Sequence, residues 1–88
     1  MFNRKYKLKD SSNRKIVDLT DPKIIIAIKN AVAVILPQFT VNVYAKYFEI
    51  IGGARPSDSD LRMLGKEIAA NSYYLNSIKK NGLFIGYN

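Results

Sequence analysis

Residues 2–9 read FNRKYKLK, an alternation of apolar and polar side chains that decides the fold class. In an extended strand, Phe2, Tyr6 and Leu8 fall on one side and lysines fall on the other, while Arg4 breaks the pattern. The turn-forming residues 10–13, DSSN, and the β-branched run 15–19, KIVDL, come next. This pattern predicts a basic β-hairpin over residues 1–20, which is only marginally stable unless it packs on the rest of the chain.

Three helices are predicted after the hairpin, and the first has clear end signals. Asp21 is a good N-cap, and Pro22 at the first helical position loses no hydrogen bond. Pro37 stops the helix, because the residue before a proline is disfavoured in helical geometry. We therefore expect a helix over 22–36, apolar nearly all round and central to the fold.

The second and third helices are predicted over 40–51 and 58–80. An apolar stripe at helical spacing, with Gly52-Gly53 beyond it, indicates the second. Ser57 followed by Asp60 approximates a capping box that starts the third, and Gly82 is available to end it.

The expected fold is α+β, with residues 1–88 forming one domain. The N-terminal β-hairpin packs beside three α-helices, and residues 83–87 form a short strand that pairs with the hairpin. The alternative is an all-α three-helix bundle, in which residues 1–20 are a basic arm and 83–87 a tail.

Cysteine and histidine are both absent from the 88 residues. Their absence excludes disulfides, zinc fingers, thiol nucleophiles and imidazole bases. Four of the seven acidic residues have turn or capping roles, and no phosphate-binding glycine loop occurs. We expect a protein that is not an enzyme and that needs no metal or cofactor.

The formal net charge is +7, and residues 1–20 hold six of the 14 cations against two acidic residues. Such a charge attracts nucleic acid, anionic lipid or an acidic protein surface, although it also serves solubility. The chain is rich in Ile, Lys and Asn, whose codons are A/T-rich, which suggests a phage, a mobile element or a low-GC bacterium as its source.

Two sets of side chains are candidates for non-specific contact with nucleic-acid phosphates. Lysines at period 2 on a two-stranded ribbon suit the major groove, and cations with an aromatic along a helix suit phosphate contact and base stacking. Ordinary solvated lysines on an edge strand or a helix face would look similar. The hairpin set is Lys5, Lys7, Lys9, Arg14 and Lys15, and the helix set is Arg62, Lys66, Tyr73 and Lys80.

Two strongly apolar helices in so small a chain predict self-association or a partner surface, although core packing is the simpler explanation. The expected anchors are Tyr44, Tyr47, Phe48 and Tyr74, because aromatic residues dominate interface energetics. The leading hypothesis is a non-catalytic accessory protein that binds nucleic acid and assembles with its own copies. The alternative is a protein-interaction module, such as a virion component or an inhibitor or immunity-type protein.

The most apolar stretch, residues 24–36, is interrupted by Lys29 and Asn30 and is shorter than the roughly 20 residues that span a bilayer. We therefore expect no transmembrane segment and a cytoplasmic protein, with a virion as the alternative location.

Overall fold

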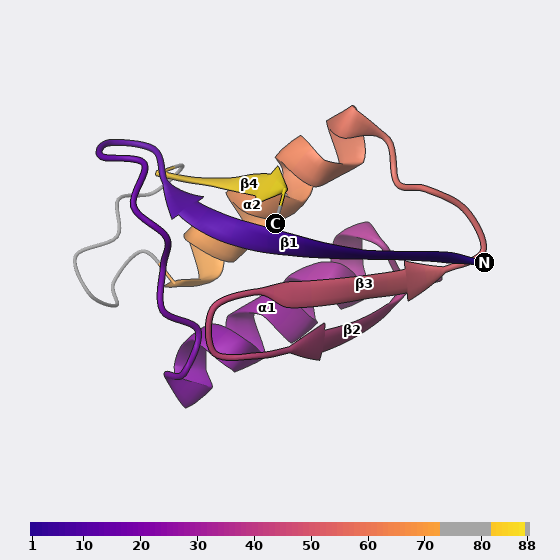
Figure 1. Cartoon of the computed structure of the whole chain (residues 1–88), viewed down its shortest axis with the longest axis horizontal. Helices are drawn as coiled ribbons and strands as arrows, with labels where there is room; N and C mark the ends of the chain where they lie inside the picture. Colours follow the sequence, from indigo (N-terminus) through magenta and orange to yellow (C-terminus); the bar gives the residue numbers. More distant parts are fainter. Residues whose placement is uncertain (73–81, 88) are drawn as a thin grey trace.

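The computed structural model describes residues 1–72 and 82–87. The elements, in chain order, are β1 (Phe2–Asp10), α1 (Pro22–Ile35), β2 (Thr40–Val43), β3 (Phe48–Gly52), α2 (Asp58–Ser72) and β4 (Leu83–Tyr87). The strands form one antiparallel sheet in the order β2-β3-β1-β4, and both helices lie behind it in the view of Figure 1. This element order is the split β-α-β arrangement. The α+β class is confirmed, and the all-α alternative is wrong.

The strand β1 is central and pairs on both sides. Its first half pairs with β3, and its second half pairs with β4. Tyr6 stands at the crossover, opposite Phe48 on one side and Tyr87 on the other. The predicted short strand over 83–87 and its pairing with the N-terminal strand are thereby confirmed.

The predicted return strand over 15–19 is wrong. That segment meets β1 only through an isolated bridge between Lys9 and Ile16 and through two backbone bonds, from Val17 N to Leu8 O and from Asp10 N to Lys15 O. A longer ladder cannot form, because β3 already occupies this edge of β1 from Phe2 to Tyr6.

The predicted second helix over 40–51 is also wrong, because this segment forms the hairpin of β2 and β3. Its side chains fit a period of two as well as a helical period, and its β-branched and aromatic residues favour strands. Val41 and Val43 face the core from β2, and Phe48 and Ile50 face it from β3. The Tyr44 amide donates to the Tyr47 carbonyl and closes the turn between them.

The first helix agrees closely with its prediction. The Asp21 side chain accepts from the Lys23 amide at 2.9 Å, and α1 ends just before the cap Leu36 and Pro37. The start of α2 is also confirmed, since Ser57 Oγ accepts from the Asp60 amide at 3.0 Å. The predicted continuation of α2 over 73–80 lies outside the described residues. Within residues 1–72 and 82–87 there are therefore two helices, where three were expected.

The hydrophobic core lies between the inner face of the sheet and the two helices. The sheet contributes the fully buried side chains Tyr6, Leu8, Phe48 and Ile50, and the helices contribute Ile24, Ile28, Leu64 and Ile68. No helix in the described part of the chain is long and apolar enough to cross a membrane.

Gly65 is where α2 lies closest to β4. A Cβ atom built on Gly65 would lie 3.3 Å from the Leu83 carbonyl oxygen and 3.4 Å from the Phe84 Cα. Gly65→Val should therefore push α2 away from β4 and lower the free energy of unfolding by about 1 to 3 kcal/mol, as overpacking does. Urea unfolding followed by circular dichroism measures this loss. Ala70→Val on the exposed side of α2 is the control, and an equal loss in both variants would contradict the close approach.

Candidate nucleic-acid interface

The sheet has one face that neither helix covers, here called the open face, and Figure 1 looks directly onto it. The strand register assigns side chains to this face, because cross-strand partners point the same way. Its members are Thr40 and Asn42 on β2, Glu49 and Ile51 on β3, Asn3, Lys5, Lys7 and Lys9 on β1, and Phe84 and Gly86 on β4. Tyr44 and Tyr47 extend it at the end of the β2–β3 hairpin.

Three lysines follow one another along the centre of the open face. Lys5, Lys7 and Lys9 stand at alternate positions of β1, about 7 Å apart, which is twice the rise per residue of a strand. Within residues 1–72 and 82–87, the only ion pair joins Lys46 and Asp18. No carboxylate of these residues therefore forms an ion pair with the three lysines. A Cβ on Gly86 would lie 3.1 Å from Lys9 Cε, so this glycine gives the Lys9 side chain room to cross β4.

Aromatic side chains flank the lysines on both sides. The rings of Tyr44 and Tyr47 stack with their centroids 4.9 Å apart, and Lys5 Nζ lies 5.2 Å from the Tyr47 ring centroid. This distance is within the range of a cation–π contact. On the other side of β1, the β4 residue Phe84 stands opposite Lys9 and is 38% exposed. The open face therefore offers cations between two aromatic surfaces.

Glu49 is the one acidic member of the open face. It stands opposite Lys5 on β1 and opposite Asn42 on β2. Asn42 Nδ2 donates to Glu49 Oε1 at 3.3 Å, so the carboxylate is drawn toward the β2 edge. The lysines outnumber it three to one, and the centre of the open face is positively charged.

The structure does not bring the two predicted basic sets together. Lys5, Lys7 and Lys9 share the open face, whereas Arg62 and Lys66 are exposed on α2, which packs on the other face of the sheet. Arg14 and Lys15 are exposed in the segment that follows β1. Tyr73, Tyr74 and Lys80 lie outside the described residues.

The predicted aromatic anchors also separate. Tyr44 is 44% exposed and Tyr47 is half-buried beside it, and both belong to the open face. Phe48 is 0% exposed and its ring stacks on Tyr6 in the core, with centroids 5.9 Å apart. Phe48 is therefore a core residue and cannot anchor a partner on the folded surface.

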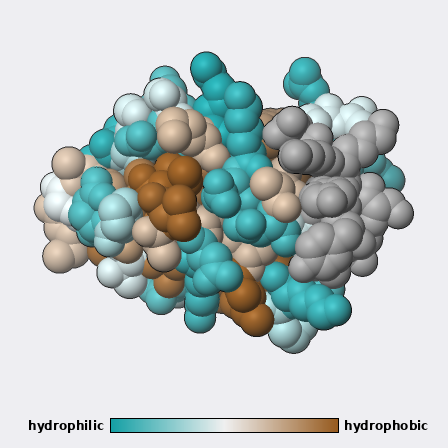
Figure 2. Space-filling view, turned by 180° about the vertical axis from the view of Figure 1, so that it is seen from behind, coloured by the Kyte–Doolittle hydropathy of each residue, from teal (hydrophilic) through white to brown (hydrophobic). Residues whose placement is uncertain are grey.

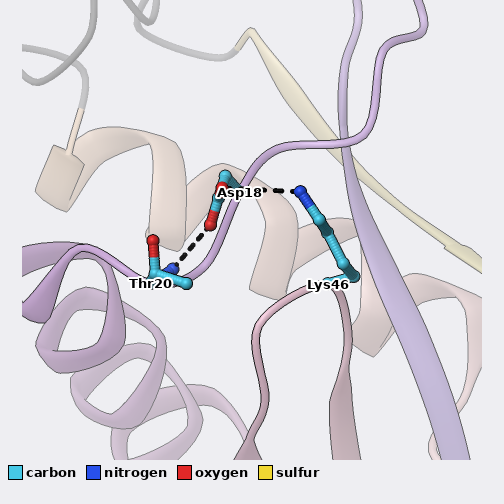
Figure 3. Close-up of polar contacts among 3 residues, drawn as sticks. All are labelled: Asp18, Thr20 and Lys46. Carbon is cyan, nitrogen blue, oxygen red and sulfur yellow. Dashed lines mark hydrogen bonds and ion pairs between the residues drawn. The ribbon is translucent and has the colours of Figure 1, made fainter.

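A small polar cluster fixes the β2–β3 turn to the segment before α1 (Figure 3). Asp18 Oδ1 accepts from the Thr20 amide at 2.9 Å, and Asp18 Oδ2 lies 3.4 Å from Lys46 Nζ. The Leu19 amide also donates to the Ala45 carbonyl. The hydrogen bonds from Thr20 to the Asp18 carboxyl hold its pKa below the ordinary value of 3.8. The Lys46 charge acts in the same direction but less strongly.

This cluster predicts how stability changes with pH. Because the pKa of Asp18 is lower in the folded chain, its contribution is complete above the ordinary value of 3.8 and is lost as the pH falls through the folded pKa. Asp18→Asn should therefore be less stable than the parent at pH 7, and the gap should narrow as the pH falls below 3.8. Thermal unfolding at pH 7 and in acid measures the gap, and a gap that is larger in acid would contradict this assignment.

Several polar residues were missed by sequence reasoning because they come together only in the fold. Arg4 lies with its guanidinium carbon 4.1 Å from the Tyr87 ring centroid, and Arg55 Nη2 donates to Tyr87 Oη at 3.0 Å. Tyr6, which the strand pattern placed on one side with Phe2 and Leu8, has a buried hydroxyl close to them. The one visible signal was Arg4, which interrupts the apolar side of the β1 pattern.

No family model, curated protein or solved structure matches this chain in the three comparisons. The described residues also contain no group of three or more acidic, His or Cys side chains that could hold a metal ion. The geometry of the surfaces is therefore what points to a function.

Proposed function

We propose that this protein binds single-stranded nucleic acid on the open face, without sequence preference. The observation that supports this most strongly is the row of Lys5, Lys7 and Lys9 on an uncovered sheet, with the Tyr44–Tyr47 stack on one side and Phe84 on the other. Lysines neutralise phosphates, and exposed rings stack on bases of any sequence.

The geometry favours a single strand over a duplex. A major-groove reader presents a helix or a narrow two-stranded ribbon. Here the basic strand β1 is the inner strand of a four-stranded sheet and has β3 and β4 beside it. A broad sheet face is too wide for the groove, whereas unpaired bases can lie flat against it. Four-stranded sheets that bind single-stranded RNA through stacked aromatics are an analogy at the level of the fold only.

A binding titration tests the proposal. A fluorescein-labelled oligothymidylate of about 15 nucleotides covers a typical single-strand site, and its anisotropy is followed as protein is added. We expect tighter binding than to a duplex of equal length, and an affinity that falls steeply between about 50 and 200 mM salt. Equal affinity at both salt concentrations, or a preference for the duplex, would contradict the proposal.

A second candidate function is a protein–protein contact through the helix side. Ile26 and Val34 on α1 are 57% and 66% exposed, and Met63 on α2 is 50% exposed. Figure 2 shows hydrophobic patches on this side, between hydrophilic side chains. Such side chains are typical of partner surfaces. Light scattering on the purified protein tests the simplest case, self-association, and Ile26→Ser with Val34→Ser should then produce a monomer.

A further inference from the structure

A cavity of about 230 Å³ lies beside the first turns of α2 and the sheet strands β1 and β4. It belongs to the helix side of the sheet, because Tyr6, Ile85 and Tyr87 are inward-facing positions in the strand register. Among its lining residues, only Phe84 also belongs to the open face. Its lining residues are Tyr6, Asp58, Leu61, Arg62, Phe84, Ile85 and Tyr87.

One residue that lines the cavity, Tyr6, carries a buried polar group that needs a partner. Tyr6 is 0% exposed, and its hydroxyl has no hydrogen-bond partner in the part of the chain that the structure describes. A buried hydroxyl without a partner is costly and uncommon in native structures. A ligand in the cavity would supply that partner.

The charged groups around the cavity favour an anion. Arg62 lines the cavity. Arg4 lies over the ring of Tyr87, and Arg55 donates a hydrogen bond to the Tyr87 hydroxyl. Because Tyr87 Oη accepts from Arg55, its own proton can be donated to a ligand. Asp58 is the only carboxylate among the lining residues.

The electrostatic field at the Tyr6 hydroxyl agrees with this charge count. Burial is the largest cause that raises the pKa of Tyr6, followed by the neighbouring Tyr87. Arg4 and Arg55 lower it, and each acts more strongly than Asp58, which raises it. Among the charged side chains around this hydroxyl, the two guanidiniums therefore outweigh the one carboxylate.

We propose that this cavity is a binding site for a phosphate group, with Tyr6 Oη donating to one oxygen and the Arg62 guanidinium pairing with others. A guanidinium matches phosphate in shape and charge. The phosphate belongs either to a small phosphorylated molecule or to the terminal phosphate of a nucleic-acid strand. The site does not depend on the proposed function of the open face.

Inorganic phosphate is the first probe. Its binding is followed by NMR shifts of the Tyr6, Arg62 and Tyr87 amides, with chloride at equal ionic strength as the reference. We expect Tyr6→Phe and Arg62→Gln each to weaken phosphate binding by about tenfold, as expected for losing one hydrogen bond to a charged group. Lys66→Gln, an exposed residue on the same helix, makes the same charge change and should leave the affinity unchanged.

Three results would overturn the proposal. They are shifts identical to those in chloride, binding that survives both Tyr6→Phe and Arg62→Gln, and an equal loss in Lys66→Gln. A second measurement compares oligonucleotides with and without a 5′-phosphate. A gain from the 5′-phosphate that Tyr6→Phe removes supports the site with a strand end as the source. Binding of inorganic phosphate with no such gain supports the site with a small molecule as the source.

Discussion

Phe48→Ala is expected to lower the free energy of unfolding by about 3 to 5 kcal/mol. The ring is 0% exposed, stacks on Tyr6 and faces the core from β3. Removing it leaves a cavity between the sheet and the helices that their packing can only partly close. A small domain has only about 5 to 15 kcal/mol of stability, so this variant should lose a substantial fraction of it. Urea unfolding followed by circular dichroism measures the loss.

Tyr44→Ala is the matched control in the same hairpin. Its side chain is 44% exposed on the opposite face of the sheet, where it stacks on Tyr47. Losing that stack should cost about 1 kcal/mol. If Tyr44→Ala were as destabilising as Phe48→Ala, the assignment of the two side chains to different faces would be contradicted.

Replacing Lys5, Lys7 and Lys9 together with glutamine should weaken single-strand binding about 100-fold at about 0.1 M salt. Each phosphate contact adds about 0.7 to the slope of log affinity against log salt for a single strand. Three lost contacts therefore reduce that slope by about 2. The fold should persist, because these side chains point away from the core. The anisotropy titration, repeated at several salt concentrations, gives both the affinity and the slope.

A matched triple variant separates position from net charge. Lys23, Lys29 and Lys66 are exposed on α1 and α2, away from the open face. Changing them to glutamine removes the same three charges. We expect a loss of less than about tenfold, since these charges act only through the long-range field. Equal losses in the two triple variants would show that net charge, and not the open face, binds the strand.

Local signals made α1 and the start of α2 predictable. Asp21, Pro22 and Pro37 act on the backbone next to them, and Ser57 caps the helix that follows it. The β2–β3 hairpin could not be separated from a helix in this way. Its apolar residues satisfy both periods, and only the partner strand β1 selects the extended form.

The return strand after β1 failed for a related reason. Residues 15–19 have suitable side chains for a strand, but β3 competes for the same edge of β1 and takes most of it. Which of two candidate strands pairs with β1 depends on the whole fold. A turn signal at residues 10–13 cannot decide it.

The lysine row and the cavity also differ in how far the sequence alone predicts them. The row of lysines was predictable, because period 2 along one strand places Lys5, Lys7 and Lys9 on one face. The separation of Arg62 and Lys66 from that row depends on which face of the sheet α2 covers. The cavity proposed to bind phosphate brings together Tyr6, Arg62 and Tyr87 from distant parts of the chain, and no local pattern connects them.

The most direct test of the central claim is an NMR titration of isotope-labelled protein with a short single-stranded oligonucleotide, recording backbone amides and lysine side chains. We predict that the largest shifts occur at Lys5, Lys7 and Lys9 on β1, at Tyr44 and Tyr47, and at the β4 residues beside them. The outward side of α2, including Lys66, should change little. Shifts confined to α1 and α2, or no shifts at low salt, would contradict binding on the open face.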